Sequence, residues 1–275
     1  MSTLLSNRNW QQNPPEQFPP TDAAAWGYDY HGLWKTLLLY GVEQTMRWIP
    51  RGDFLMGSPE EEPERDDDEQ QHEVELTSGF WLADTACTQA LWQAVMGENP
   101  SEFTDAENPV ENVSWHDAME FLEKLNNHTA DGLFQLPSEA QWEYACRAGT
   151  TSAFYLGENI TSEQVNFDGN APYNNEPESK YRGKTVPVKS FTPNPWGLYQ
   201  MHGNVREWCS DWFEHDYPAG KQIDPVGPED GARRVLRGGC WINGGRRCRS
   251  ASRAHYVPDG RDDRVGFRLS QAGFI

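Results

Sequence analysis

Long apolar runs are missing from this sequence. None approaches the about 20 residues that a membrane-spanning helix needs, and the mean hydropathy of the 275 residues is −0.80. The first twenty residues also lack the basic start and the apolar stretch of a secretory signal, and they carry no lipid-attachment motif. We therefore expect a protein that does not insert into a membrane and is not exported by an ordinary signal.

Cysteine is scarce, and the common catalytic motifs are absent. The cysteines form no CxxC pair, which excludes a disulfide scaffold, and we expect them to be mostly reduced. They are Cys87, Cys146, Cys209, Cys240 and Cys248. The seven histidines never occur with zinc-site spacing, and the chain has neither a GxSxG turn nor a glycine-rich phosphate loop. These absences exclude the enzymes that are recognised by such local motifs.

Positive charge is scarce overall but abundant near the carboxyl end. The chain has 23 Lys and Arg against 42 Asp and Glu, a net charge of −19. This argues against nucleic acid or an anionic membrane as a partner, because phosphate binding needs a basic surface. Residues 233–268, however, hold ten Arg and three Asp with no Lys or Glu. We expect Arg249, Arg253, Arg261 and Arg268 to hold loops through carboxylate pairs rather than to form an anion site.

Turn formers and helix caps predict an α+β fold with much irregular loop. Residues 1–45 are expected to be an N-terminal extension that packs on a domain formed by residues 46–275. Helices are expected after Thr88, Ser114 and Ser138, whose side chains suit helix N-caps, with ends near Gly97 and Gly149. Short strands are expected at 53–56, 73–76, 186–191, 235–238 and 266–269.

Two long irregular segments stand out. Residues 58–73 hold nine carboxylates and one Arg. Because like charges repel, we expect this acidic run to be a solvated loop, with a metal-binding loop as the alternative. Between residues 165 and 181 almost every residue is a turn former, and loops of this length inside a domain are usually held by metal or by aromatic packing.

Six strings of residues carry a resemblance to a known family. They are MRWIPRGDFLMGSPEEE, GFWLADTACTQALWQAVMGENPS, NPVENVSWHDAMEFLEKLN, LPSEAQWEYACRAGT, NPWGLYQMHGNVREWCSDWF, and RVLRGGCWINGGRRCRSASR followed by VGFRL. In this order, over residues 46–269, they resemble the formylglycine-generating enzyme family, also called sulfatase-modifying factors. The resemblance implies a variant of the C-type lectin fold with short antiparallel strands, few helices, much irregular loop and, often, bound calcium.

The resemblance is weaker at the residues that perform the family's chemistry. The family's enzymes have two cysteines, five residues apart, after an RGG motif, and the two thiolates bind copper and activate oxygen. Aligning that motif with residues 237–239 places Asn243 at the first cysteine position and Cys248 at the second. Because a Cu(I) site needs paired sulfur, we expect the chain not to be an enzyme. The alternative is an oxygen-dependent metalloenzyme with a site around Cys240 and Cys248, or an inactive descendant of one.

The segment 240–264 is similar to the variable segments of diversity-generating retroelement proteins, a branch that shares this fold. In that branch, adenine-directed mutagenesis rewrites codons, typically the asparagine codon AAC. Thirteen positions here hold residue types whose codons are reachable from AAC by changing adenines alone. They are Ile242, Asn243, Gly244, Arg247, Ser252, Ala254, His255, Tyr256, Val257, Gly260, Asp262, Asp263 and Arg264. The set mixes apolar, charged and small residues without any period, whereas a core or a catalytic site demands particular side chains.

The resemblance therefore predicts a non-catalytic binding protein whose segment 240–264 forms a diversified recognition surface. The expected ligand is an unknown macromolecule, with protein favoured, because Tyr and Arg are frequent hot-spot residues. Ile242, Tyr256 and Val257 would supply apolar anchors. The alternative is an irregular loop in an inactive family member. We expect a location in the cytoplasm or in a phage particle, and surface display stays open.

The resemblance also implies oxygen ligands for calcium. Asn166, the main-chain oxygen of Phe167, Asn204 and Glu207 stand where enzymes of the family bind Ca²⁺, a cation that prefers oxygen. The alternative is that Asn204 and Glu207 only satisfy backbone groups in a tight turn. We thus expect no required cofactor, and structural calcium is the metal that the resemblance suggests.

Overall fold

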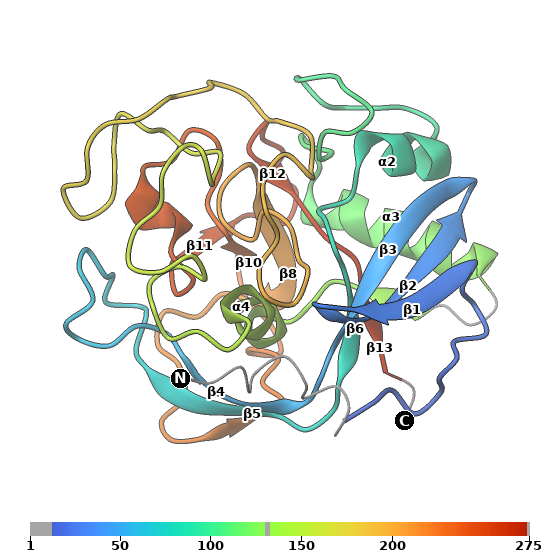
Figure 1. The fold of residues 1–275 in the computed structure, drawn as a ribbon, viewed down its shortest axis with the longest axis horizontal. Helices are drawn as coiled ribbons and strands as arrows, with labels where there is room; N and C mark the ends of the chain where they lie inside the picture. The colour runs from blue at the N-terminus through green and yellow to red at the C-terminus, as the bar shows by residue number, and fades with distance from the viewer. Residues whose placement is uncertain (1–12, 130–132, 274–275) are drawn as a thin grey trace.

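The computed structural model describes residues 13–129 and 133–273, which form three sheets, three α-helices and one 3₁₀ helix (Figure 1). Long loops join short, mostly antiparallel strands, so the predicted α+β fold class is confirmed. No helix in this described part of the chain is both long and apolar enough to cross a bilayer.

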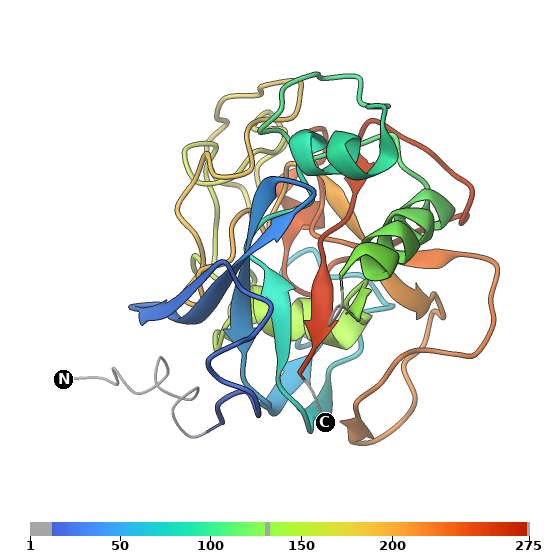
Figure 2. The ribbon, with the colours of Figure 1, turned by 90° about the vertical axis from the view of Figure 1, so that its right-hand side faces the viewer.

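The largest sheet has six strands in the order β1-β2-β3-β6-β13-β7, each antiparallel to its neighbours. The strands are β1 (Ala25–Asp29), β2 (Gly32–Leu39), β3 (Val42–Ile49), β6 (Phe80–Ala83), β7 (Phe134–Gln135) and β13 (Ser270–Ala272). Figure 2 shows β13 beside β6, so segments from opposite ends of the described chain share one sheet. The segment 25–45, expected to pack on the domain, enters this sheet as β1, β2 and part of β3.

Two smaller sheets complete the fold. The four-stranded sheet has the order β11-β10-β8-β12, and only its β8 and β12 strands are parallel. Its strands are β8 (Arg206–Trp212), β10 (Arg234–Arg237), β11 (Arg253–Tyr256) and β12 (Val265–Gly266). The three-stranded sheet joins β4 (Gly52–Met56), β5 (His72–Leu76) and β9 (Gln222–Ile223). The acidic run therefore connects β4 to β5.

The three α-helices begin where the cap residues predict. Helix α2 (Gln89–Met96) follows Thr88, whose hydroxyl accepts a hydrogen bond from the N–H of Leu91, and it ends at Gly97 with a φ of 93°. Helices α3 (Trp115–His128) and α4 (Glu139–Arg147) follow Ser114 and Ser138, each in a reciprocal capping box. These starts are confirmed because a cap is a local interaction that the sequence alone specifies.

The predicted strands are confirmed in part. Strands β4, β5 and β10 lie at 53–56, 73–76 and 235–238 within one residue. The strand predicted at 266–269 instead falls mostly in the gap between β12 and β13. The strand predicted at 186–191 is wrong, because Pro187 has no N–H for a ladder and its carbonyl closes a turn with the N–H of Ser190.

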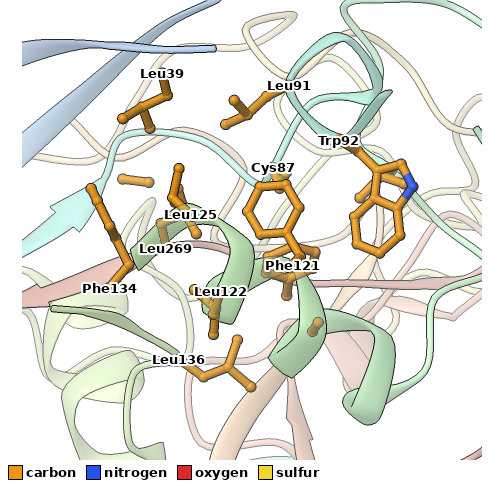
Figure 3. Packing of buried hydrophobic residues seen from close by; sticks show 14 of the residues in the cluster. Leu39, Cys87, Leu91, Trp92, Phe121, Leu122, Leu125, Phe134, Leu136 and Leu269 are labelled. Carbon is orange, nitrogen blue, oxygen red and sulfur yellow. The ribbon is translucent and has the colours of Figure 1, made fainter. Parts of the chain in front are cut away.

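The main core lies between α2, α3 and the six-stranded sheet (Figure 3). Trp92 of α2 stacks on Phe121 of α3 with ring centroids 5.4 Å apart, and Phe267 meets both rings edge-on. Leu91 and Leu125 fill the space toward the sheet and are fully buried. Large aromatic rings thus supply much of the apolar burial, as the tryptophan content predicts.

Three arginines near the carboxyl end are completely buried, and each is paired with a carboxylate. The pairs are Arg237 with Glu143, Arg249 with Glu69, and Arg268 with Glu207. Arg268 binds Glu207 through two contacts, from Nε to Oε2 at 2.6 Å and from Nη2 to Oε1 at 2.7 Å. Of the four arginines predicted to hold loops through carboxylate pairs, Arg249 and Arg268 do so here, Arg253 pairs with Glu139 and Arg261 with Asp117, so this prediction is confirmed; Arg237 is not part of it.

The acidic run is only partly solvated. Glu62 and Glu69 are buried and both bind Arg249, with Nη1 of Arg249 at 2.6 Å from Oε1 of Glu62. The expectation of a wholly solvated loop is wrong here, because buried arginines compensate these carboxylates. Asp66, Asp68 and Glu69 each place one oxygen within 4.8 Å of the others. Arginines already bind Asp66 and Glu69, so the metal-binding alternative gains no support.

Replacing Arg268 by Met should destabilise the fold strongly, because the buried Glu207 carboxylate would lose its counter-charge. We expect the free energy of unfolding to fall by about 3–5 kcal/mol, measured by urea denaturation followed through tryptophan fluorescence. The matched control is Arg261→Met, whose pair with Asp117 is solvent-exposed and should contribute less than about 1 kcal/mol. Equal losses in the two variants would contradict the role of the buried pair.

Candidate functional site

The segment 242–264 reaches from one edge of the four-stranded sheet to the other. It contains the 3₁₀ helix Gly245–Cys248, the edge strand β11 and a loop that returns to β12 (Figure 1). Of the thirteen predicted variable positions, Ile242, Arg247 and Val257 are exposed, nine are half-buried, and Ser252 is buried. The segment is thus largely accessible, whereas Ser252, expected to contact ligand, is turned into the interior.

Three of these positions meet the acidic run in an open cleft of about 390 Å³. Arg247, Ala254 and His255 line one part of the cleft. The other lining residues are Asp66, Asp67, Asp68, Arg206 and Arg253. Nη1 of Arg247 donates to Oδ2 of Asp66 at 2.6 Å and so ties the 3₁₀ helix to the acidic run. The cleft therefore combines positions expected to vary with charged residues that are not among the thirteen variable positions.

A second group of variable positions gathers around Tyr256. The ring of Tyr256 lies nearly parallel to the buried Trp208, with centroids 6.4 Å apart, so part of this ring belongs to the scaffold. A Cβ at Gly260 would lie 2.3 Å from Cε1 of Tyr256, which means that the two positions cannot both carry large side chains in this arrangement. We expected Tyr256 to point outward as an apolar anchor, but part of its side chain packs against the main core. Arg264 in the same stretch pairs with Asp262.

The first variable positions lie against the irregular segment 165–181 instead. The N–H of Asp168 donates to the main-chain oxygen of Asn243 at 2.8 Å. A Cβ at Gly244 would lie 2.9 Å from the carbonyl oxygen of Ala171, so a side chain there would force the neighbouring loop to move. The structure thus places these variable positions in three groups along the segment.

Two buried cysteines, Cys240 and Cys248, lie at the start of the variable segment 240–264 and within it. The sulfur of Cys248 packs on the turn at Gly239, where a Cβ would lie only 2.7 Å from Sγ. The sulfur of Cys240 lies 3.1 Å from Oδ1 of Asn243. Burial raises the pKa of both thiols, which keeps them protonated at neutral pH. A metal ion bound by these sulfurs would have to displace their protons.

The oxygens expected to bind calcium are only partly available. Oδ1 of Asn166 is buried and has no hydrogen-bond partner among the described residues, which suits a metal ligand. The main-chain oxygen of Phe167 also accepts no hydrogen bond within that part of the chain. Asn204 lies beside them, but its Oδ1 already accepts from Nδ2 of Asn166 at 3.0 Å and from the N–H of Val186 at 3.0 Å.

Glu207 does not suit a calcium ligand. Both of its oxygens bind the guanidinium of Arg268, and Oε2 also accepts a hydrogen bond from Nε1 of Trp142 at 2.7 Å. The expected role of Glu207 is corrected accordingly: it is the buried partner of an arginine and one support of the four-stranded sheet. Asn166 and Phe167 keep the role of expected ligands.

Nothing in the sequence identifies the fixed walls of the cleft. Arg206 follows directly on the GNV turn, and Asp66, Asp67 and Asp68 stand far away in the acidic run. The one available signal was the opposite charge of residues 58–73 and 233–268, which favours contact between them. It could not specify which carboxylates would be buried and which would face a cleft.

Comparison with known proteins identifies the domain. The family model of the Sulfatase-modifying factor enzyme 1-like domain matches residues 41–272. Relatives include the formylglycine-generating enzymes of Thermomonospora curvata, 38% identical over 204 residues, and of Mus musculus, 31% identical over 207 residues. These matches cover 70% and 72% of this chain but only 63% and 53% of the two enzymes. The chain thus matches little more than half the length of these relatives.

Solved structures extend the comparison. Treponema denticola variable protein 1 has a TM-score of 0.74 at 30% identity, over 87% of this chain and 99% of that protein. PvdO from Pseudomonas aeruginosa has a TM-score of 0.72 at 23% identity, over 92% of this chain and 100% of that protein, and shows the fold alone. The resemblance to the formylglycine-generating enzyme family, and within it to a variable protein, is confirmed.

One expectation must be corrected. The asparagine at position 243 predicts a chain that is not an enzyme, and this prediction is wrong, because curated relatives aligned with most of the chain are formylglycine-generating enzymes. A substitution at one metal-ligand position does not outweigh sequence similarity that extends over the whole domain. The match over residues 41–272 and these relatives together show that the chain belongs to the sulfatase-modifying factor enzyme 1-like family.

Proposed function

We propose that this protein recognises a macromolecular ligand through residues 242–264. The class of ligand that we favour is a polypeptide. The observation that supports this best is the cleft in which Arg247, Ala254 and His255 lie opposite the aspartates of the acidic run. The backbone beneath is fixed by buried arginine pairs, so side chains can change while the shape of the site is kept. The similarity to Treponema denticola variable protein 1 extends over 87% of this chain and supports ligand recognition by a variable segment.

The chemistry of the surface favours polypeptide over nucleic acid. The cleft presents three Asp beside three Arg, and the protein as a whole has a net charge of −19, which opposes the approach of a phosphate backbone. Ile242 and Val257 add apolar area at 40% and 44% exposure. Arg206 forms no hydrogen bond or ion pair through its side chain within the described residues, so its guanidinium is available to a carboxylate of the ligand.

A peptide selected on the wild-type protein from a phage-displayed random library should bind at this cleft. The double variant Arg247→Ala/His255→Ala should weaken its binding at least tenfold in biolayer interferometry, because both side chains line the cleft. The control Lys124→Ala removes an exposed charge on α3 that does not line the cleft, and it should leave the affinity within about twofold. Unchanged binding by the double variant would overturn the proposal.

Diversification of the segment has a consequence at the level of DNA. The gene should be accompanied by a near-copy of the codons for residues 240–264 that differs only where the copy has adenine, and by a reverse transcriptase gene. Sequencing the flanking genomic DNA tests this. Substitutions spread evenly over all four bases, or the absence of any near-copy, would show that the segment is not rewritten in this way.

A second candidate function is oxygen-dependent chemistry at a copper ion, and the pair of buried thiols favours it. The main-chain N–H groups of Cys240 and Gly203 lie close to the sulfur of Cys248, so the two cysteines are neighbours although Asn243 stands at the first cysteine position. Paired sulfur suits Cu(I). When bound, copper would activate oxygen, and the protein's part would be to hold the two sulfurs in a site shielded from water.

Copper retention tests this second function. Wild-type protein should hold one Cu(I) per chain against a competing chelator, and the occupancy should rise with pH, because the buried thiols must lose their protons to bind. Cys248→Ala and Cys240→Ser should each abolish retention. Cys87→Ala, which removes an equally buried thiol from the main core, should not. Retention by all three variants, or by none of the four proteins, would exclude this site.

A further inference from the structure

A cavity of about 230 Å³ lies on the other side of Arg253, which lines both this cavity and the cleft. It is enclosed by the start of α4, the end of β8 and the segment 214–228, which carries β9 alongside β5 (Figure 1). Its apolar wall includes Met56, Trp212, Pro225, Val226 and Pro228. None of the predicted variable positions lines it, so it is a separate feature of the fold.

Asp211 lies in the wall of this cavity and has no ion-pair partner among the described residues. The residue is 4% exposed, and its Oδ2 accepts hydrogen bonds from the N–H of Glu139 and from the hydroxyl of Ser210, both at 2.9 Å. Its Oδ1 accepts no hydrogen bond within that part of the chain. Burial, and then the neighbouring Glu139 carboxylate, raise the pKa of Asp211 to about 7. The carboxylate thus has no direct ionic partner in the described part of the chain, although the charges of Arg253 and Arg234 lie close enough to attract it.

The arginine that lines the cavity does not fill this role. Arg253 binds Glu139 through Nε at 2.8 Å and Nη2 at 3.0 Å, and its Nη1 donates to the main-chain oxygens of Asp68 and His215. The flat guanidinium is further held over the ring of Tyr217, 4.1 Å from its centroid. Its donors are therefore already used, and its charge is matched by Glu139.

The backbone at Gly227 passes close to Asp211. Gly227 has a φ of 72°, and a Cβ at this position would come within 3.0 Å of Cβ and 3.4 Å of Oδ1 of Asp211, so a glycine is needed here to keep a side chain away from the carboxylate. The mouth of the cavity carries two more carboxylates, Glu214 and Asp216. The aromatic rings of Trp212 and Tyr217 also line it, and each already contacts a guanidinium, that of Arg234 at 3.5 Å and that of Arg253 at 4.1 Å from the ring centroid.

We propose that this cavity binds a primary alkylammonium group, whose charge pairs with Oδ1 of Asp211 and whose carbon chain packs on Pro225 and Val226. A compact ammonium group can donate to the unused carboxylate oxygen, and an apolar chain suits the remaining wall. A free alkylamine and a lysine side chain of a polypeptide share this chemistry. None of the thirteen variable positions lines this site, so its failure would leave the proposed ligand recognition unaffected.

The charge requirement can be tested with pentylammonium chloride and 1-pentanol at pH 8, followed by the NMR shift of the Nε1–H of Trp212. We expect pentylammonium to bind at least tenfold more tightly than the uncharged alcohol. Asp211→Asn should abolish this preference, because it keeps the shape of the side chain but removes its charge. Equal affinities of the two compounds for the wild-type protein would overturn the proposal.

The location can be tested with a variant whose change lies at an exposed position. Val226 is 67% exposed and lines the cavity, so Val226→Trp should fill the entrance and weaken pentylammonium binding at least tenfold. Leu55→Trp places the same ring on β4 outside the cavity and should leave binding unchanged. Equal binding by the wild type and Val226→Trp would overturn the site even if Asp211→Asn failed to fold.

The source of the ammonium group is distinguished by Nα-acetyl-lysine amide. Binding of this compound as tightly as pentylammonium indicates a lysine side chain of a polypeptide, and binding of pentylammonium alone indicates a free amine. Both results support the proposal. Failure of both compounds to bind the wild-type protein would exclude an alkylammonium site.

Discussion

The pairing of buried arginines with buried carboxylates is the constraint on which this fold depends. A guanidinium taken out of water needs a counter-charge in good geometry, and removal of either partner leaves an uncompensated charge in the interior. Arg249 joins the carboxyl-terminal segment to Glu62 and Glu69 of the acidic run, and Arg268 joins the end of the chain to Glu207 of β8. The pairs of Arg249 fix segments that share no hydrogen-bonded strand, whereas the pair of Arg268 reinforces the parallel pairing of β12 with β8.

This constraint also explains how a segment with little regular structure can present a recognition surface. Ser252 is buried next to Arg253, while Ala254 and His255 on the same strand line the cleft. Buried and accessible residues thus follow one another within a few positions, and Arg253 is held by its ion pair with Glu139. His255 belongs to none of the buried pairs, whereas Ala254 also packs against the main core, so the composition of the surface is only partly separated from the stability of the domain.

Much of the fold could be predicted from the sequence where the determinants are local. Thr88, Ser114 and Ser138 specify helix starts by bonds to residues three positions away, and the strands beside Phe54 and Val74 follow short alternating patterns. The turn at Pro187 shows the limit, since apolar residues there suggest a strand that the missing N–H forbids.

The candidate site was less predictable because its geometry arises from distant contacts. The accessible positions follow from the resemblance, but the wall formed by Asp66 and the buried state of Glu207 depend on arginines far away in sequence. The inference from Asn243 failed for a different reason, since it judged the whole chain from one ligand position.

The place of β13 has a consequence for how the protein is made. This strand is inserted between β6 and β7, so the central sheet remains incomplete until residues 270–272 have left the ribosome. The segment that presents the cleft is synthesised just before that closing strand. The nascent domain therefore commits to its final topology only after the whole recognition segment has been translated, and every version of that segment must pass through the same late step of assembly.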